Sequence, residues 1–143
     1  MKNKILIFFT FIIFAITIYL LNGFSTKVIA QGNPYEAKLL STMDILAEQS
    51  ITNHSATGEF SHTLIDGCDF HCRNIRANKP SNSVTAENLY LGPCDINNAF
   101  SLFEKSPSHK ANIDHGYPYS QMYQTKIDDI CLYVFIYAEF KSL

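Results

Sequence analysis

The chain has 143 residues, a formal net charge of −2 and 47% hydrophobic residues, which is typical of one folded domain rather than a disordered chain. Lysine and arginine form no basic stripe along it, so nucleic acid is not an expected partner. The sequence has no internal repeat and no low-complexity tract.

The first 30 residues have the layout of a secretory signal peptide. Lys2 and Lys4 precede an apolar run from Ile5 to Leu21, and Val28–Ala30 has the small-residue spacing of a signal-peptidase site. The run is long for a signal peptide and slightly shorter than the roughly 20 residues of a membrane-spanning helix. Two interpretations of this segment therefore stay open, namely a signal peptide cleaved after Ala30 and a retained N-terminal membrane anchor. Either one places residues 31–143 outside the cytoplasm, secreted or tethered, with this segment as the only membrane contact.

Two helices are predicted in the first half of the exported part. Apolar residues recur at helical spacing from Asn33 to Asn53, and Ser55–Gly58 should end that helix. A second, short helix is predicted from Cys68 to Ala77, with Phe70 and Ile75 facing inward.

A strand and two short helices should follow. Alternating residues from Ser83 to Leu91 indicate a strand. Asp95 should cap a helix over Ile96–Phe103, whose apolar residues lie at positions i, i+3, i+4 and i+7. Ser106–Pro107 predicts another helix start, because serine caps free N–H groups and proline suits the first helical position. His109 then falls in the first turn of this helix.

A β-hairpin should end the chain. Ser120–Lys126 and Ile130–Phe140 have the composition of strands, and only the turn at Asp128–Asp129 separates them. The order of helix, helix, strand, helix and hairpin predicts an α+β fold, a sandwich of helices around one small antiparallel sheet.

All four cysteines lie in the part expected to be exported: Cys68, Cys72, Cys94 and Cys131. An even number of cysteines in a small exported domain predicts two disulfides, for which three pairings are possible. For Cys68 and Cys72 two alternatives stay open, namely free thiols on one helical turn, or a zinc site that includes His71.

Three motifs occur in order along the exported part. They are FSHT at Phe60–Thr63, AENLYLG at Ala86–Gly92 and SPSHKANI at Ser106–Ile113. With Gly67 and Arg73 between the first two, the chain resembles the CAP superfamily over about residues 39–140. This superfamily, also called the SCP-like domain, includes cysteine-rich secretory proteins, antigen 5 and pathogenesis-related proteins, and the motifs look most like its short bacterial branch. The resemblance implies an α–β–α sandwich and an extracellular location.

The resemblance also implies a site. In animal and plant members of the family, two histidines and two glutamates line a central cleft. The matching motif positions here are His62, Glu87 and His109. The second glutamate has no counterpart in register, and Glu104 is the acidic residue closest to that position in sequence.

These side chains suit three kinds of role. Two imidazoles and a carboxylate with an open position could hold Zn²⁺, which would acidify a bound water for hydrolysis. Without metal, a histidine beside a glutamate could act as a general base. Alternatively, His62, Glu87 and His109 hydrogen-bond to one another and hold the helices against the sheet.

Residues around this site could bind a ligand or belong to the core. Two roles stay open for a set of aromatic residues. The family's sterol and lipid binding implies that they line a groove, whereas their composition is equally that of an ordinary core. They are Tyr90, Phe100, Phe103, Tyr133, Phe135 and Tyr137. Asn88 and Asn112 are expected to satisfy backbone groups beside the site, because buried amides need partners. His54, His71 and His115 are expected at the surface.

Topology favours one disulfide pairing. If the Ser83–Leu91 and Ile130–Phe140 strands are antiparallel neighbours, Cys94 lies beside Cys131. Cys68 and Cys72 would then pair with each other, which predicts a distorted turn near residues 69–71.

The sequence therefore predicts a domain that binds a lipid, a small apolar molecule or an envelope protein through a cleft around His62, Glu87 and His109. A metal-dependent hydrolase of peptide or envelope material is one alternative. A structural interaction module with a vestigial cleft is the other, and it agrees with the missing second glutamate.

Overall fold

The computed structural model describes residues 33–141. The predicted signal peptide or anchor lies outside these residues. Within residues 33–141, no helix is both long enough and apolar enough to cross a membrane.

An antiparallel sheet of three strands forms the middle layer of this part of the chain. Its strands are β1 (Ser83–Gly92), β2 (Tyr119–Ile127) and β3 (Ile130–Phe140), in the order β1-β3-β2. The hairpin pairs β2 with β3 from Tyr119 opposite Ala138 to Ile127 opposite Ile130. The α+β fold and the positions of all three strands were predicted correctly from the sequence.

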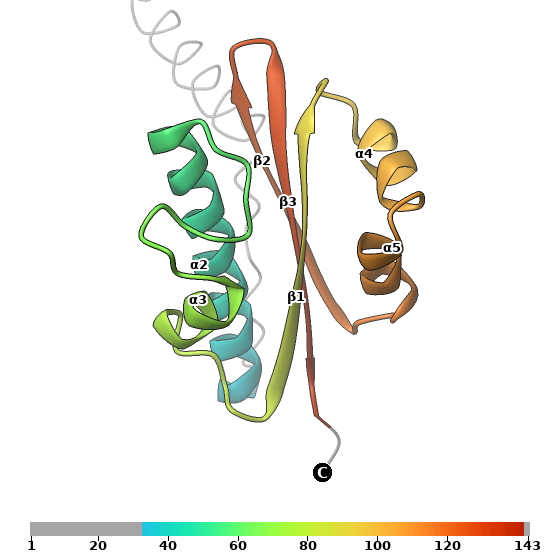
Figure 1. Cartoon of the computed structure of the whole chain (residues 1–143). Coiled ribbons are helices and arrows are strands. Elements are labelled where there is room, and N and C mark those ends of the chain that lie inside the picture. The colour runs from blue at the N-terminus through green and yellow to red at the C-terminus, as the bar shows by residue number, and fades with distance from the viewer. Residues whose placement is uncertain (1–32, 142–143) are drawn as a thin grey trace, which may run out of the picture. The chain divides into compact units, whose positions relative to one another are not determined.

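Helices cover both faces of the sheet. Figure 1 shows α2 and α3 on one side and α4 and α5 on the other. Their bounds are Pro34–Thr57, Phe70–Arg76, Ile96–Phe103 and Pro107–Asp114.

The central strand β3 contributes to a hydrophobic core on each face of the sheet, because its side chains alternate between the two faces. The core against α2 contains Leu132, Val134, Ile136 and Ala138, and the core against α4 and α5 contains Cys131, Tyr133, Phe135 and Tyr137. All eight residues are at most 8% exposed. The stripe Tyr133, Phe135 and Tyr137 is therefore buried in the core on this face.

Helix α2 extends four residues past its predicted end at Asn53 and ends within the predicted stop at residues 55–58. It ends at Thr57 because Gly58 adopts the left-handed conformation (φ 71°) and donates its N–H to the carbonyl of His54. At the other end, Asn33 accepts a hydrogen bond from the N–H of Tyr35 at 3.0 Å.

Helix α3 begins two residues later than predicted and buries a different face. Asp69 caps it by accepting a hydrogen bond from the N–H of Cys72 at 2.8 Å. Ile75, predicted to face inward, is 67% exposed, whereas Arg73 and Asn74 are buried. The prediction failed because it placed the apolar residue inside, and here an ion pair takes the inner position.

Both disulfides have the favoured pairing, Cys68–Cys72 and Cys94–Cys131. The register places Gly92 opposite Cys131, so Cys94 emerges beside it. The free-thiol and zinc alternatives for Cys68 and Cys72 are therefore wrong. Since Cys68 precedes the cap residue, the non-helical backbone at Asp69 lies ahead of α3 rather than within it.

Helices α4 and α5 begin where the sequence predicts, but they are capped differently. Asp95 accepts a hydrogen bond from the N–H of Asn97 at 2.9 Å, as expected of a cap. Ser106 makes no side-chain cap hydrogen bond, and its hydroxyl lies 3.4 Å from that of Ser108. The predicted serine cap is therefore absent, while Pro107 occupies the first turn as predicted.

Candidate functional site

Strand β1 is an edge strand, and the alternation of its side chains divides the motif AENLYLG between the two helical layers. Glu87 faces α2 and α3, where it bonds to Ser50 and Arg73. Asn88 faces α5, where it bonds to His109 and Asn112. The predicted site residues therefore lie at one edge of the sheet, on both of its faces.

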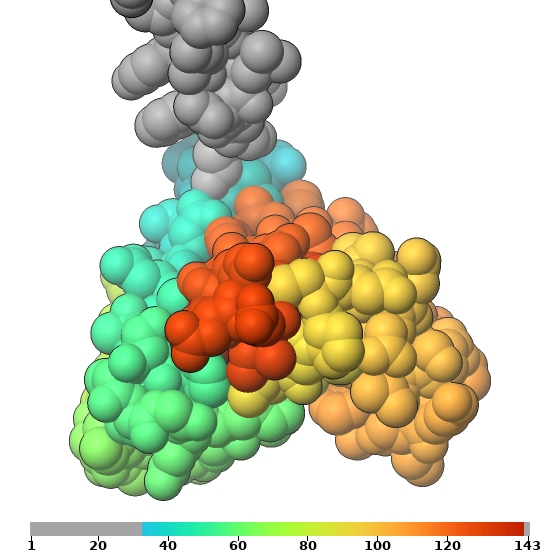
Figure 2. Space-filling model, turned by 90° about the horizontal axis from the view of Figure 1, so that it is seen from above, coloured from blue at the N-terminus to red at the C-terminus, as the bar shows by residue number. Residues whose placement is uncertain are grey.

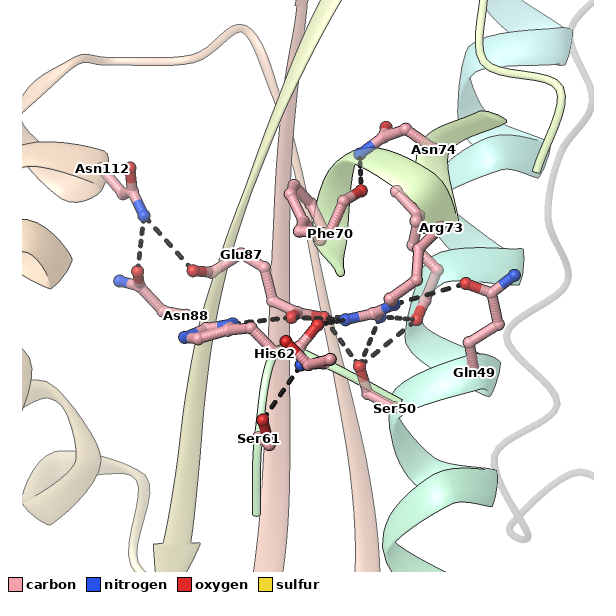
Figure 3. A network of polar contacts seen from close by, with 12 residues as sticks. Gln49, Ser50, Ser61, His62, Phe70, Arg73, Asn74, Glu87, Asn88 and Asn112 are labelled. Atoms are coloured by element: carbon pink, nitrogen blue, oxygen red, sulfur yellow. Dashed lines mark hydrogen bonds and ion pairs between the residues drawn. The ribbon is translucent and has the colours of Figure 1, made fainter. Parts of the chain in front are cut away.

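A buried ion pair joins β1 to α3. The guanidinium of Arg73 donates from Nη1 to Oε1 of Glu87 at 2.8 Å and from Nη2 to Oε2 at 2.9 Å (Figure 3). The two side chains are 0% and 1% exposed. This fork-to-fork geometry is the strongest form of an arginine–carboxylate contact.

Helix α2 supplies further partners for the same two groups. Arg73 donates to the carbonyl of Leu46 at 2.6 Å and to Oε1 of Gln49 at 3.3 Å. The Ser50 hydroxyl donates to Oε2 of Glu87 at 2.7 Å and accepts from Arg73. Removing two charges from water is unfavourable unless their remaining hydrogen bonds are made, and here they are made.

His62 completes the network from the solvent side. Its Nδ1–H donates to Oε1 of Glu87 at 2.8 Å, and its backbone carbonyl accepts from Arg73 at 3.2 Å. The His62 side chain is still 48% exposed. The carboxylate therefore fixes the orientation of the ring, and Nε2 has no hydrogen-bond partner among residues 33–141.

The hydrogen bonds of this network and the charge of Arg73 set the protonation state of Glu87. Burial alone would raise the pKa of Glu87, but hydrogen bonds from His62 and Arg73, the charge of Arg73 and the bond from Ser50 outweigh burial and lower the pKa. Glu87 is therefore an ionised carboxylate at neutral pH.

His109 approaches His62 from the other helical layer. Their ring centres lie 6.4 Å apart, and His109 also packs on Phe103 at 5.1 Å. Asn88 holds the backbone here by donating to the His109 carbonyl at 3.0 Å, and it accepts from Asn112 at 2.8 Å, as predicted for these amides. Partial burial, and then the charge of His62, lower the pKa of His109.

A hollow of about 310 Å³ opens along this edge, and we call it the β1 cleft. Its lining consists of Phe60, Leu89, Tyr90, Leu91, Leu102, Phe103, Ser106 and His109. Phe60 and Leu102 are 46% and 47% exposed. Figure 2 shows the surface hollowed between the green side, which carries α2 and α3, and the orange side, which carries α4 and α5. The cleft thus combines apolar side chains with imidazole.

The predicted zinc site does not agree with this geometry. Both oxygens of Glu87 are engaged by Arg73, with His62 and Ser50 as further donors. Within the described part of the chain, no group of three or more histidine, cysteine, aspartate or glutamate side chains could hold a metal ion. The residues present therefore do not form a zinc site in this arrangement.

Three other predicted positions differ from or refine the expectation. Glu104 lies at the surface, 52% exposed, and pairs with Lys110 at 3.4 Å, so it does not supply a second cleft glutamate. His54, expected at the surface, is 7% exposed and bonds through Nδ1 to the Glu59 carbonyl at 2.9 Å. Tyr90 does line the cleft, but it is 5% exposed, and its hydroxyl accepts from Asn98 at 2.7 Å.

Sequence reasoning missed the ion pair at the centre of the site. In the sequence, Arg73 stands out only as a motif residue, and Ser50 lies in the predicted first helix without any signal of its own. From the sequence alone, an arginine in a short helix is expected at the surface. Arg73 is buried because it pairs with Glu87, which lies on another element. The family motif was the one available sign of its importance.

Comparisons with known proteins give a fold but no family. No family model matches the chain, and no curated protein matches it. Among solved structures, the chain is similar to an outer surface protein from Borrelia burgdorferi, with a TM-score of 0.57 and 22% sequence identity. The match covers 75% of this chain and 90% of that chain. At this level of identity the similarity shows a shared fold.

Proposed function

We propose that this chain is an extracytoplasmic, CAP-like binding domain that takes the apolar part of a lipid or small amphiphilic molecule into the β1 cleft. The polar group of that ligand hydrogen-bonds to His62 or His109. The single observation that carries this proposal is the β1 cleft itself, in which His109 lies among the exposed apolar residues Phe60 and Leu102. The oriented, half-exposed ring of His62 lies 6.4 Å from that of His109.

Several observations support a location outside the cytoplasm. Both disulfides are closed, and disulfides persist in oxidising compartments. The N-terminal segment has the pattern of an export signal. The protein of similar structure is named an outer surface protein. The CAP-like part of the proposal is supported by the three motifs, whose residues His62, Glu87 and His109 lie at one edge of the sheet.

The geometry favours binding over the two alternatives. A hydrolase that depends on zinc would need Glu87 as a ligand, and Glu87 is held by Arg73. A purely structural role explains the buried Arg73–Glu87 pair, but it gives no reason for the exposure of Phe60 and Leu102. Apolar hollows with a few placed polar groups are the usual form of small-molecule sites.

Titration with octanol tests the proposal, because octanol carries one hydroxyl on an apolar chain. The oxidised protein, as exported and processed by its producing cell, is followed by heteronuclear NMR. We expect octanol to shift the signals of Phe60, Leu102 and His109. Leu102→Asp should weaken binding at least tenfold, since burying a leucine side chain contributes about 1.5–3 kcal/mol.

His71→Ala is the matched control, because His71 is an exposed histidine on α3 that does not line the cleft. Its affinity for octanol should equal that of the wild type. Shifts confined to residues outside the cleft, or equal binding by Leu102→Asp, would refute the proposal.

A further inference from the structure

A second hollow lies on the α4–α5 side of the sheet and shares no lining residue with the β1 cleft. It has a volume of about 450 Å³ and is bounded by α4, α5, β2 and β3. Phe100 and Phe135 in its wall pack edge to face at 5.2 Å, and both contact Phe103 of the β1 cleft, at 6.2 and 5.4 Å. The three rings therefore separate two independent hollows. We call this one the β2 pocket.

The β2 pocket has an exposed apolar lining. Ile96, Phe100 and Met122 are 36%, 38% and 45% exposed, although each is large and apolar. They come from α4 and β2, so they lie on two sides of the same hollow. Pockets that bind small molecules have volumes of roughly 300–1,000 Å³ and mostly apolar walls, and this hollow agrees with both.

One residue in the wall of the pocket, Tyr137, has a buried hydroxyl without a hydrogen-bond partner within residues 33–141. Tyr137 is 8% exposed, and its hydroxyl is the one buried side-chain nitrogen or oxygen without a hydrogen bond among the residues that the structure describes. The Asn88 amide bonds to His109 and Asn112, and its lowering effect on the Tyr137 pKa is that of a donor to the hydroxyl oxygen, so the hydroxyl proton is left without an acceptor in this part of the chain. Burial raises the pKa of Tyr137, and Asn88 opposes only part of that rise, so the group remains an O–H donor at neutral pH.

The charge around the pocket favours a neutral ligand. Its lining contains no charged residue. Burial, and then the negative charge of Glu139, raise the pKa of the lining residue Tyr117. A carboxylate bound in the pocket would find no cation in the wall to balance its charge.

We propose that the β2 pocket binds a small, neutral, apolar molecule that carries one hydrogen-bond acceptor, such as a ketone or an ester, and that the Tyr137 hydroxyl donates to that acceptor. The ligand covers Ile96, Phe100 and Met122 and supplies the missing partner of a buried donor. A buried polar group without a partner is rare in folded proteins and calls for such an explanation. The proposal does not depend on the β1 cleft, because the two hollows have different residues.

Three related probes test this assignment. Benzylacetone carries a ketone, phenylbutyrate replaces it with an anion, and butylbenzene has no acceptor. Each is titrated into the exported, oxidised protein while the NMR signal of the Met122 methyl group is followed. We expect benzylacetone to bind at least tenfold more tightly than phenylbutyrate.

Two variants show whether the hydroxyl recognises the ligand. Tyr137→Phe should weaken benzylacetone binding about fivefold and leave butylbenzene binding unchanged, because one hydrogen bond is lost. Tyr133→Phe is the control, since Tyr133 is buried on the same face of β3 but does not line the pocket. Tyr137→Phe should also melt at or above the wild-type temperature, because it removes an unpaired hydroxyl.

Four results would overturn the inference. They are an unmoved Met122 signal, equal benzylacetone affinity in wild type and Tyr137→Phe, tighter binding of the anion than of the ketone, and a lower melting temperature for Tyr137→Phe than for wild type.

Discussion

Arg73 links three elements of the fold through one side chain. It bonds to Glu87 on β1, to Leu46 and Ser50 on α2 and to the carbonyl of His62. Its full burial means that none of these contacts can be replaced by bulk water. The position of the His62 ring, 6.4 Å from that of the cleft residue His109, therefore depends on a residue that a ligand in the cleft need not touch.

The first prediction concerns this ion pair. Removing one partner of a buried pair leaves an uncompensated charge and costs about 3–5 kcal/mol. Arg73→Met and Glu87→Gln should each lower the free energy of unfolding by that amount, measured by urea denaturation of the oxidised protein.

The double variant Arg73→Met/Glu87→Gln is the control, because it removes both charges together. It should be clearly more stable than the sum of two single losses predicts. Strict additivity of the two substitutions would contradict the ion pair.

The second prediction concerns acid. The pKa of Glu87 is lowered by folding from an ordinary value of 4.5, so its unfolded form binds protons first as the pH falls. Its stabilising contribution is complete above pH 4.5 and is lost as the pH falls through the folded-state pKa. Denaturation at a series of pH values should therefore show a steeper loss of stability below pH 4.5 in the wild type than in Glu87→Gln. Parallel curves for the two proteins would exclude this role.

Protonation of His109 should also lower the stability of the fold on acidification, but at a higher pH than protonation of Glu87. Folding lowers its pKa from 6.5, so protonation favours the unfolded chain. Stability should begin to fall as the pH drops below 6.5, and His109→Gln should remove this earlier and shallower part of the loss.

At the scale of elements, two neighbouring helices begin with different chemistry. Asp95 bonds to the second N–H of α4, whereas Ser106, among the described residues, makes no side-chain cap hydrogen bond and reaches only the Ser108 hydroxyl, at 3.4 Å. The start of α5 relies instead on Pro107, whose fixed φ suits the first turn.

The third prediction compares these two starts. Asp95→Ala should lower the free energy of unfolding by about 1 kcal/mol, the usual contribution of a side-chain cap. Ser106→Ala should change it by less than about 0.5 kcal/mol, because no cap hydrogen bond is lost. Urea denaturation of both variants decides the question, and an equal loss in both would show that Ser106 caps α5 after all.

The elements also show what local sequence can predict. Strand β3 was found because its long apolar run and the adjacent turn are local signals, and the register of β1 and β3 then accounts for the Cys94–Cys131 pairing. The inner face of α3 was predicted wrongly because Ile75 looks like a core residue and Arg73 does not. The partner that buries Arg73 lies 14 residues away on another element, and no periodicity encodes that distance.

At the scale of the whole molecule, the motifs predicted where the site lies but not its chemistry. Three separated segments do converge, with the rings of His62 and His109 6.4 Å apart. Their chemistry could not be predicted, because ligand geometry depends on which oxygens of Glu87 are already bonded. Phe100, Phe135 and Tyr137, for which the resemblance implies a lipid groove, line the β2 pocket. The rest of its wall could not be predicted, because no motif connects these residues with α5 and β2.

The central claim is that His62 serves binding while Arg73 and Glu87 serve stability. Its most direct test is His62→Ala, measured for both octanol affinity by NMR and free energy of unfolding by urea. We predict that octanol binding weakens at least fivefold, while stability falls by only about 1 kcal/mol, the typical net contribution of one hydrogen bond. A loss of about 3 kcal/mol or more, roughly that of a broken buried pair, with unchanged octanol affinity would contradict the account and make His62 a structural residue.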